Sequence, residues 1–223
     1  MKMYNLDGSE GKMCGNGIRC VGKFLYDHGM VDINEKDEIT IETLSGIKKL
    51  KAYTSGGKVN RLRVDMGKAI LEPKEIPVVL DGDKVVDRPV EIAGKNYNIT
   101  CVSMGNPHCV VFMDDIDDLD IETVGPEFEN DKLFPERVNT EFVTVLDDHT
   151  IKMRVWERGS GETWACGTGA CAVAVAACEN GFCKKGEDIK IKLKGGDLII
   201  NYTDETVYMT GNAEKVFEGE VEV

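Results

Sequence analysis

Hydrophobic residues recur at helical spacing in two places along this chain and at alternating positions almost everywhere else. Residues 170–180 are nearly all Ala, Val and Cys, so this stretch predicts a helix that is apolar on every side and buried. A second helix is predicted over residues 14–29, from the helical spacing of Ile18, Val21, Phe24 and Leu25. The pattern therefore indicates two helices of different character in a chain made mostly of strands.

Alternation of apolar and polar residues predicts short strands through the rest of the chain. Gly-containing turns separate several of them, among them SGGK, DGD and AGK at residues 55–58, 81–83 and 93–95. An acidic surface loop with a short helix after Leu119 interrupts the series. The predicted strands cover residues 39–43, 48–53, 61–66, 78–80, 85–92, 97–102, 109–112, 138–146, 150–158, 188–193 and 197–202.

Two segments of the chain repeat one another. MCGNGIRCVGKFLYDHG begins at Met13 and ACGTGACAVAVAACENG begins at Ala165, and each places a cysteine before a Gly-x-Gly turn that opens a predicted helix. Downstream, DEITIETLSG aligns with EDIKIKLKGG. Two copies of one unit explain this most simply. We predict an α+β fold of two pseudo-symmetric domains, each of mostly antiparallel strands around a central helix, at residues 1–58 plus 211–223 and at 59–210.

The two copies are not equally complete. A long strand-rich stretch from Arg61 onward precedes Cys166, whereas Cys14 lies close to the start of the sequence. If the halves are true copies, the first lacks most of its leading strands. The sequence therefore predicts a truncated first domain.

Composition narrows the classes of function. Asp and Glu outnumber Lys and Arg by 40 to 27, for a net charge of −13, which argues against binding nucleic acid or an anionic membrane surface. No apolar run approaches the ~20 residues of a membrane span, and the N-terminus has no hydrophobic signal core. The 8 cysteines form no CxxC pair, which argues against a zinc site. We expect a cytoplasmic protein without a metal or structural disulfides.

Cys14 and Cys166 stand apart because of the Gly-x-Gly turn that follows each. A cysteine at a helix N-terminus feels the positive end of the helix dipole, which predicts a pKa lowered from about 8.5 toward neutrality. The amides of the first helical turn offer a site for a carboxylate, and glycine lets the backbone approach a ligand. With a substrate carboxylate held there, one thiolate could remove an α-proton while the other thiol protonates the opposite face. This predicts stereoinversion without pyridoxal phosphate, and no motif for an organic cofactor is present.

Four segments in order resemble the diaminopimelate epimerase family: NLDGSEGKMCGNGIRC, SMGNPHC, PERVNTEFV and WERGSGETWACGTGACA. The resemblance runs from about Tyr4 to the C-terminus. It implies a cofactor-independent isomerase that interconverts LL- and meso-diaminopimelate in lysine and peptidoglycan synthesis, with diaminopimelate as its small-molecule partner and a homodimer as its assembly. It also implies that about sixty residues at the start of family members are missing here, as the unequal repeat already predicts.

Carried over position by position, the resemblance makes Cys14 and Cys166 the acid/base thiols. His108 and Glu157 would tune the pKa values of these thiols. The reacting carboxylate would bind at Gly15, Asn16, Gly167 and Thr168. The distal amino acid group of the substrate would bind at Asn5, Asn106, Asn139 and Arg158, with Glu157 also in contact with the substrate.

Other interpretations compete with these. His108 could be a core or turn histidine, Glu157 and Arg158 could form an ordinary ion pair, and Asn5 and Asn139 could order turns. The protein could also be another two-thiol racemase, such as one acting on proline, or an inactive paralogue that retains the fold. The residues assigned to the distal group favour diaminopimelate, because proline has no distal charged group. The truncated start favours the inactive paralogue.

Overall fold

The computed structural model of the chain describes residues 1–4, 8, 10–11, 13–33 and 37–220. The chain divides into two compact units, Met1–Asp65 with Thr210–Val223 and Met66–Met209. The boundary expected at residue 59 falls inside β3 (Lys58–Asp65). This strand stays with the first unit because it pairs along its length with β2 (Gly46–Ser55).

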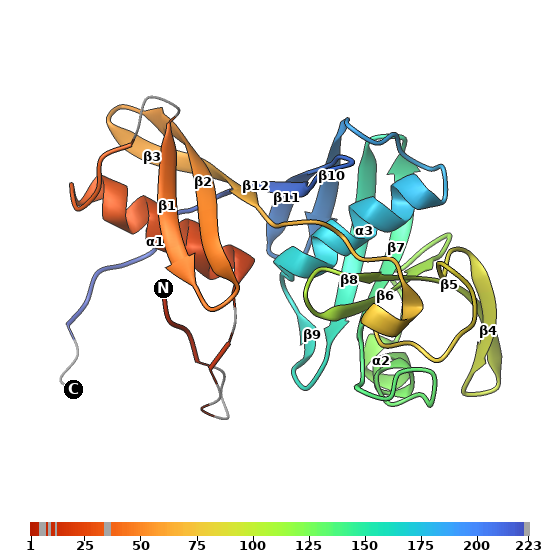
Figure 1. Cartoon of the computed structure of the whole chain (residues 1–223). Helices are drawn as coiled ribbons and strands as arrows, with labels where there is room; N and C mark the ends of the chain where they lie inside the picture. Colours follow the sequence, from red (N-terminus) through yellow and green to blue (C-terminus); the bar gives the residue numbers. More distant parts are fainter. Residues whose placement is uncertain (5–7, 9, 12, 34–36, 221–223) are drawn as a thin grey trace. The chain divides into compact units, whose positions relative to one another are not determined.

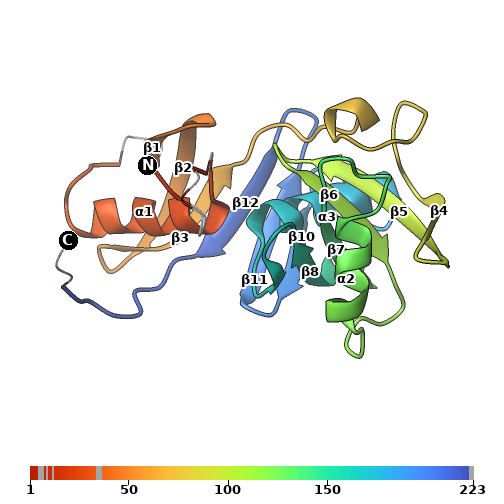
Figure 2. The ribbon, with the colours of Figure 1, turned by 90° about the horizontal axis from the view of Figure 1, so that it is seen from below.

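In the first unit, α1 (Gly15–Asp27) lies along one face of an antiparallel sheet (Figures 1 and 2). The sheet consists of β1 (Glu38–Thr43), β2 and β3 in that order. Gly22 marks the closest approach of helix and sheet, because a Cβ there would lie 2.8 Å from the Cδ2 atom of Leu62. A small core forms at this contact, and within it Ile18, Leu50 and Leu62 are fully buried.

One mixed sheet runs through the second unit in the order β11-β10-β8-β7-β6-β5-β4, with β9 paired to β8 (Figure 1). Neighbours are antiparallel except for β6 with β7 and β8 with β10. β12 (Val207–Asn212) carries the chain from the second unit into the first. The bounds are β4 (Arg88–Ile92), β5 (Lys95–Ser103), β6 (Pro107–Phe112), β7 (Asn139–Asp147), β8 (Thr150–Glu157), β9 (Gly161–Thr163), β10 (Asp188–Leu193) and β11 (Gly196–Tyr202).

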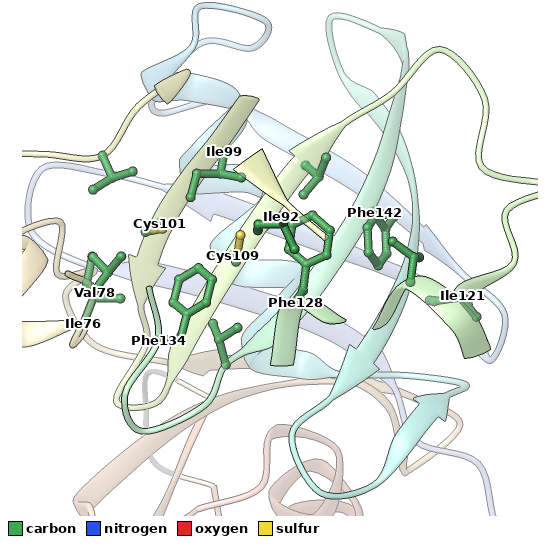
Figure 3. Packing of buried hydrophobic residues seen from close by; sticks show 14 of the residues in the cluster. Ile76, Val78, Ile92, Ile99, Cys101, Cys109, Ile121, Phe128, Phe134 and Phe142 are labelled. Atoms are coloured by element: carbon green, nitrogen blue, oxygen red, sulfur yellow. The ribbon is translucent and has the colours of Figure 1, made fainter. Parts of the chain in front are cut away.

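A hydrophobic core occupies one face of this sheet beneath α2 (Ile121–Glu129) (Figure 3). Strand alternation sends Cys101 of β5, Cys109 of β6 and Phe142 of β7 into the core, where they join Phe128 of α2. The rings of Phe128 and Phe142 meet edge to face with centroids 5.4 Å apart. Because side chains alternate along a strand, the neighbours of these residues must point to the other face.

The helix α3 (Gly167–Glu179) packs against β5, β6, β7, β10 and β11. Its residues from Ala170 to Ala177 are fully buried, which confirms the predicted all-round apolar helix. His108 of β6 and Glu141 of β7 are also fully buried. A Cβ on Gly169 would lie 2.5 Å from Glu141 Oε1, so this carboxyl group points at the first turn of α3. The α3 side of the sheet therefore combines an apolar helix with buried polar side chains.

The predicted α+β fold, with strands packed on a helix in each unit, is confirmed, but the strand predicted at residues 78–80 is wrong. After the 3₁₀ helix η1 (Pro73–Glu75), the amides of Val78 and Val79 donate to Pro73 O at 2.9 Å and to Leu133 O at 2.8 Å. Val78 is buried in the core beneath α2, so its apolar character reflects burial of an irregular segment. Among the described helices, none combines the length and apolarity that a membrane span requires.

Candidate active site

Cys14 caps the N-terminus of α1 in the first unit. Its backbone is extended, with φ −132° and ψ 118°, and its Sγ accepts a hydrogen bond from Gly17 N at 3.3 Å. The first helical bond runs from Ile18 N to Cys14 O at 2.9 Å. The amides of Gly15 and Asn16 lie ahead of that bond, in the turn where a helix can bind an anion. A partly exposed thiol thus adjoins two amides of a helix terminus.

Arg19, which was not predicted from the sequence as a site residue, stabilises this first turn. Its guanidinium is buried, and Nη1 donates to Gly15 O at 3.1 Å while Nε donates to Asn212 O at 3.3 Å. Both acceptors belong to the first unit. Arg19 follows a core residue of the helix, and nothing in the local pattern marks it as buried.

Cys166 caps α3 in the second unit with nearly the same conformation. Its φ is −118° and its ψ is 111°, and its Sγ accepts a hydrogen bond from Gly169 N at 3.4 Å. The first helical bond runs from Ala170 N to Cys166 O at 3.0 Å, so the amides of Gly167 and Thr168 lie ahead of it. Both cysteines lie at helix N-termini, as predicted. Cys166 is the more buried of the two.

The lowered pKa expected for a helix-capping thiol is wrong for Cys166. Burial raises the pKa of this thiol well above its ordinary value, and the negative charges of Glu157 and Glu141 raise it further. The Thr168 hydroxyl, 3.5 Å from Sγ, and the Gly169 amide lower the pKa but do not offset these effects. Burial and the two carboxyl groups raise the pKa of Cys166 by more than the helix terminus lowers it. Cys166 is therefore a protonated thiol at neutral pH.

A continuous series of hydrogen bonds connects a buried carboxyl group to the Cys166 thiol. Glu141 Oε1 lies 2.7 Å from His108 Nδ1, and His108 Nε2 lies 3.1 Å from Asn106 Oδ1. Asn106 Nδ2 donates to Thr168 Oγ1 at 3.3 Å, and Thr168 Oγ1 lies 3.5 Å from Cys166 Sγ. Three predicted site residues, His108, Asn106 and Thr168, are therefore brought together with the predicted thiol.

Glu141 was not predicted from the sequence as a site residue. It lies in the VNTEFV segment, one position before the core residue Phe142, so strand alternation alone assigns it to the face opposite Phe142. A charged residue on a strand usually marks a solvated face. Its position inside a long apolar strand could have identified it. A buried ionisable group requires a hydrogen-bond or ion-pair partner, so such a position indicates a polar neighbour.

Asn139 joins two neighbouring site segments. It is buried at the start of β7, where its Nδ2 donates to Pro107 O at 2.8 Å and its Oδ1 accepts from Arg158 N at 3.0 Å. Both ends of its amide thus hold backbone groups next to Asn106 and Arg158. These contacts agree with the alternative interpretation that Asn139 orders turns. They also place Asn139 beside Asn106 and Arg158, two of the predicted substrate-binding residues.

Glu157 and Arg158 occupy the end of β8 and have separate partners. The Thr163 hydroxyl donates to Glu157 Oε1, and Arg158 Nη1 donates to Glu136 O at 2.8 Å. Glu157 acts electrostatically on both Cys166 and Glu141. The predicted Asn5 lies outside the described residues, so its place in the site is not described. In the described part of the chain, no group of three His, Cys, Asp or Glu side chains is arranged to hold a metal ion.

Glu129 at the end of α2 anchors the turn that carries Arg158. Its carboxylate is buried and accepts hydrogen bonds from Trp156 Nε1 at 2.7 Å, Gly159 N at 2.9 Å and Arg137 Nη1 at 3.0 Å. Glu129 was not predicted as a site residue, because it directly follows a stretch of sequence that is typical of an acidic surface. The Glu129 carboxylate at Gly159 and the Asn139 side chain at Arg158 therefore both hold the β8–β9 turn.

We expect Glu129→Ala to lower the free energy of unfolding by about 0.5–1.5 kcal/mol for each hydrogen bond lost, here those from the partly buried Trp156 indole and from the Gly159 amide. Urea denaturation measures the loss, and Glu127→Ala, an exposed carboxylate on the same helix, is the matched control. The control should change stability by less than about 0.5 kcal/mol. Equal unfolding midpoints for the two variants would show that Glu129 does not hold the turn.

The sequence as a whole matches one family. The model of the family described as diaminopimelate epimerase matches residues 1–72 and 100–216. The chain is 52% identical over 232 residues to diaminopimelate epimerase of Agathobacter rectalis, with 100% of this chain and 80% of that protein aligned. It is 53% identical over 225 residues to the enzyme of that name from Acetivibrio thermocellus, with 100% of this chain and 79% of that protein aligned.

Solved structures show a related fold. A probable proline racemase from Agrobacterium radiobacter superposes with a TM-score of 0.71 at 16% identity, over 95% of this chain and 68% of that one. A hydroxyproline epimerase from Agrobacterium vitis superposes with a TM-score of 0.70 at 15% identity, over 95% of this chain and 66% of that one. At identities of 15–16%, the solved structures show only that the fold is shared. The family model and the relatives at 52–53% identity show which family the chain belongs to. The chain belongs to the diaminopimelate epimerase family.

Proposed function

We propose that this protein is an isomerase that inverts the α-carbon of LL-diaminopimelate to give meso-diaminopimelate, a step of lysine biosynthesis, without an organic cofactor. One observation carries the proposal: each unit places a cysteine at the N-cap of a helix, with the amide three residues on donating to its sulfur. Family membership supplies the substrate. The proline-specific alternative rests on likeness of fold alone.

In the proposed reaction, a thiolate at one of the two cysteines takes the α-proton, and the electrons of the C–H bond pass into the substrate carboxylate as an enolate. The thiol of the other cysteine then gives its proton to the opposite face of the carbon, so one thiol is lost and one is gained in each turnover. Cys166, held as a protonated thiol by burial and neighbouring carboxyl groups, suits the proton-giving role in the first half of this cycle.

The amides of the two helix termini would bind the reacting carboxylate. Gly15 and Asn16 begin α1, and Gly167 and Thr168 begin α3. Backbone amides at a helix terminus are fixed before the reaction begins, so they can stabilise the enolate charge without reorganising. The Gly17 and Gly169 amides donate to the sulfurs, so each thiol lies within the same first turn as the amides proposed to bind the carboxylate.

The remaining site residues would select the substrate. Arg158 offers a planar guanidinium for the distal carboxylate, and Asn106 and Asn5 would bind the same distal group. Asn139 would hold Arg158 and the Asn106 loop in place through its two backbone contacts. Glu157 and His108 would set the protonation of Cys166.

The test is isotope exchange in deuterated water. We expect the purified chain, given LL-diaminopimelate and no cofactor, to form meso-diaminopimelate that carries deuterium at the inverted α-carbon, as read by proton NMR and mass spectrometry. L-Proline is the matched control substrate and should neither exchange nor invert. Inversion of proline with no action on diaminopimelate would favour the proline racemase alternative, and the absence of both reactions would favour an inactive paralogue.

We also propose that the protein acts in the cytoplasm, as its composition leads us to expect, and that it forms a homodimer, as the family resemblance implies. Sedimentation of the purified chain tests the assembly: a single species at the monomer mass across the working concentration range would contradict it. Fractionation of the source cells, with the protein followed by antibody, tests the location.

A further inference from the structure

Glu141 is a fully buried ionisable group to which the proposed mechanism assigns no proton transfer. Its Oε1 lies 2.7 Å from His108 Nδ1, and its Oε2 has no hydrogen-bond partner among the described residues. Both side chains of this pair have no exposed surface. Burial raises the pKa of Glu141, although the bond to His108 acts to lower it. The pair therefore retains a proton more firmly than a solvated carboxylate would.

The pair controls the direction of the hydrogen bonds that reach Cys166. With a proton between Glu141 Oε1 and His108 Nδ1 and a second hydrogen on Nε2, the imidazole donates to Asn106 Oδ1. Asn106 Nδ2 then donates to Thr168 Oγ1, and the hydroxyl hydrogen of Thr168 is left to point at Cys166 Sγ. Each group in the series gives a hydrogen to the next.

Loss of one proton from the pair reverses this direction. An ionised Glu141 beside a neutral His108 takes the hydrogen on Nδ1, so Nε2 becomes an acceptor. The amide of Asn106 must then turn over to donate to Nε2, and the Thr168 hydroxyl turns toward Asn106 and away from the sulfur. The same event adds a negative charge to the pair, which opposes a thiolate at Cys166.

We propose that Glu141 is a positioning residue for the reaction: through His108 and Asn106, it holds the Thr168 hydroxyl hydrogen against the Cys166 sulfur. The inference rests on the proposed function for its consequence in catalysis, but its geometry stands on the described contacts alone. The titratable groups that act on this arrangement are His108 and Cys109 of β6, Glu157 of β8 and Cys166 itself.

The test compares Glu141→Gln with Glu141→Leu. A glutamine has nearly the same shape, and its Nε2 can donate to His108 Nδ1, so the hydrogen on His108 Nε2 and the series beyond it are kept. A leucine fills the space but leaves Nδ1 without a partner in a buried site. We expect inversion to stay within about tenfold of the unchanged protein in Glu141→Gln and to fall about 10²-fold in Glu141→Leu, because a misplaced group at the reacting centre costs this much.

A second readout does not need turnover. The rate at which iodoacetamide alkylates the Cys166 peptide, followed by mass spectrometry across a pH series, reports the thiolate fraction of that residue. Glu141→Leu removes the first member of the series, so the Thr168 hydroxyl hydrogen is no longer held against the sulfur and the Cys166 midpoint should rise, with about tenfold slower alkylation below the midpoint for each unit of the rise. Glu141→Gln keeps both the series and the net charge of the protonated pair, so its Cys166 profile should match that of the unchanged protein. The Cys14 peptide serves as the internal control and should keep its profile. Glu122→Gln, an exposed carboxylate on α2, should change neither profile.

These outcomes decide the inference separately from the proposed function. A Cys166 profile in Glu141→Leu that superposes on that of the unchanged protein would overturn it, as would equal inversion rates in the two Glu141 variants. If the unchanged protein does not invert diaminopimelate, the proposed function fails while the alkylation profiles still decide the role of Glu141. If Glu141→Leu does not fold, Glu141→Gln still decides the inference, because a loss of inversion of about 10²-fold or a shifted Cys166 profile in that variant would overturn it.

Discussion

Replacing Cys166 by alanine is expected to reduce the rate of inversion of LL-diaminopimelate by about 10²–10⁴-fold, the usual contribution of one positioned acid or base. Cys14→Ala should cause a loss of the same order. The two variants remove one sulfur each from a helix N-cap and leave the backbone amides of the first turn in place. Each substitution also removes the sulfur that accepts the Gly17 or Gly169 amide, which costs about 0.5–2 kcal/mol of stability, so the thermal midpoint of each variant is measured beside its rate.

Exchange and inversion should separate in these variants. A protein with one remaining thiolate can still remove the α-proton from the face it reaches and return a solvent deuteron to that face. Deuterium would then enter the substrate with retained configuration, while the opposite isomer fails to form. Chiral chromatography followed by mass spectrometry measures both quantities in one sample.

The control for these variants is Cys178→Ala, which removes another thiol from the same helix as Cys166. Cys178 lies near the end of α3, away from the N-cap, and should leave the inversion rate unchanged. Full inversion by either Cys14→Ala or Cys166→Ala would sink the two-thiol mechanism. Equal losses in all three variants would indicate damage to folding instead.

The elements that carry the thiols could be predicted because their signals are local. A cysteine, a Gly-x-Gly turn and an apolar repeat fix a helix start within a few residues: α1 begins one residue after the predicted position 14, and α3 begins three residues before the predicted position 170. Alternation likewise located β1, β2 and β5. It failed at Val78, where burial without pairing gives the same apolar signal as a strand.

The protonation state of the site could not be predicted, because it depends on contacts distant in sequence. The helix terminus at Cys166 predicts a lowered pKa, but Glu141 on β7 and Glu157 on β8 reverse the outcome through neighbours that the sequence does not place. The contacts of Asn139 also depend on residues distant in sequence, because its side-chain amide binds the backbone of Pro107 and of Arg158. Motif resemblance could name such residues but not their partners.

Gly169→Ala is the other change for which we expect a large effect. It places a methyl group against Glu141, the first residue of the hydrogen-bonded series that leads to Cys166. The new Cβ would lie 2.5 Å from Glu141 Oε1 and 3.3 Å from Cys166 Cβ. Glu141 is fully buried and bound to His108, so it cannot move aside without breaking that bond. Either the carboxyl group is displaced or the first turn of α3 shifts. Overpacking of this kind costs about 1–3 kcal/mol, against a gain of about 1 kcal/mol in helix propensity.

The repeated segment supplies a matched control, because Gly17 occupies the equivalent position in α1. A Cβ on Gly17 would lie 3.2 Å from the terminal Cε of Met1, a flexible side chain that can yield. Neither glycine has a positive φ, so alanine strains neither backbone. We expect Gly17→Ala to leave the thermal midpoint unchanged or higher, and Gly169→Ala to lower it while cutting inversion about 10²-fold through misplacement of Thr168 and Glu141. A Gly169→Ala protein that is as stable as the Gly17→Ala protein and fully active would show that Glu141 and the turn of α3 are not in close contact.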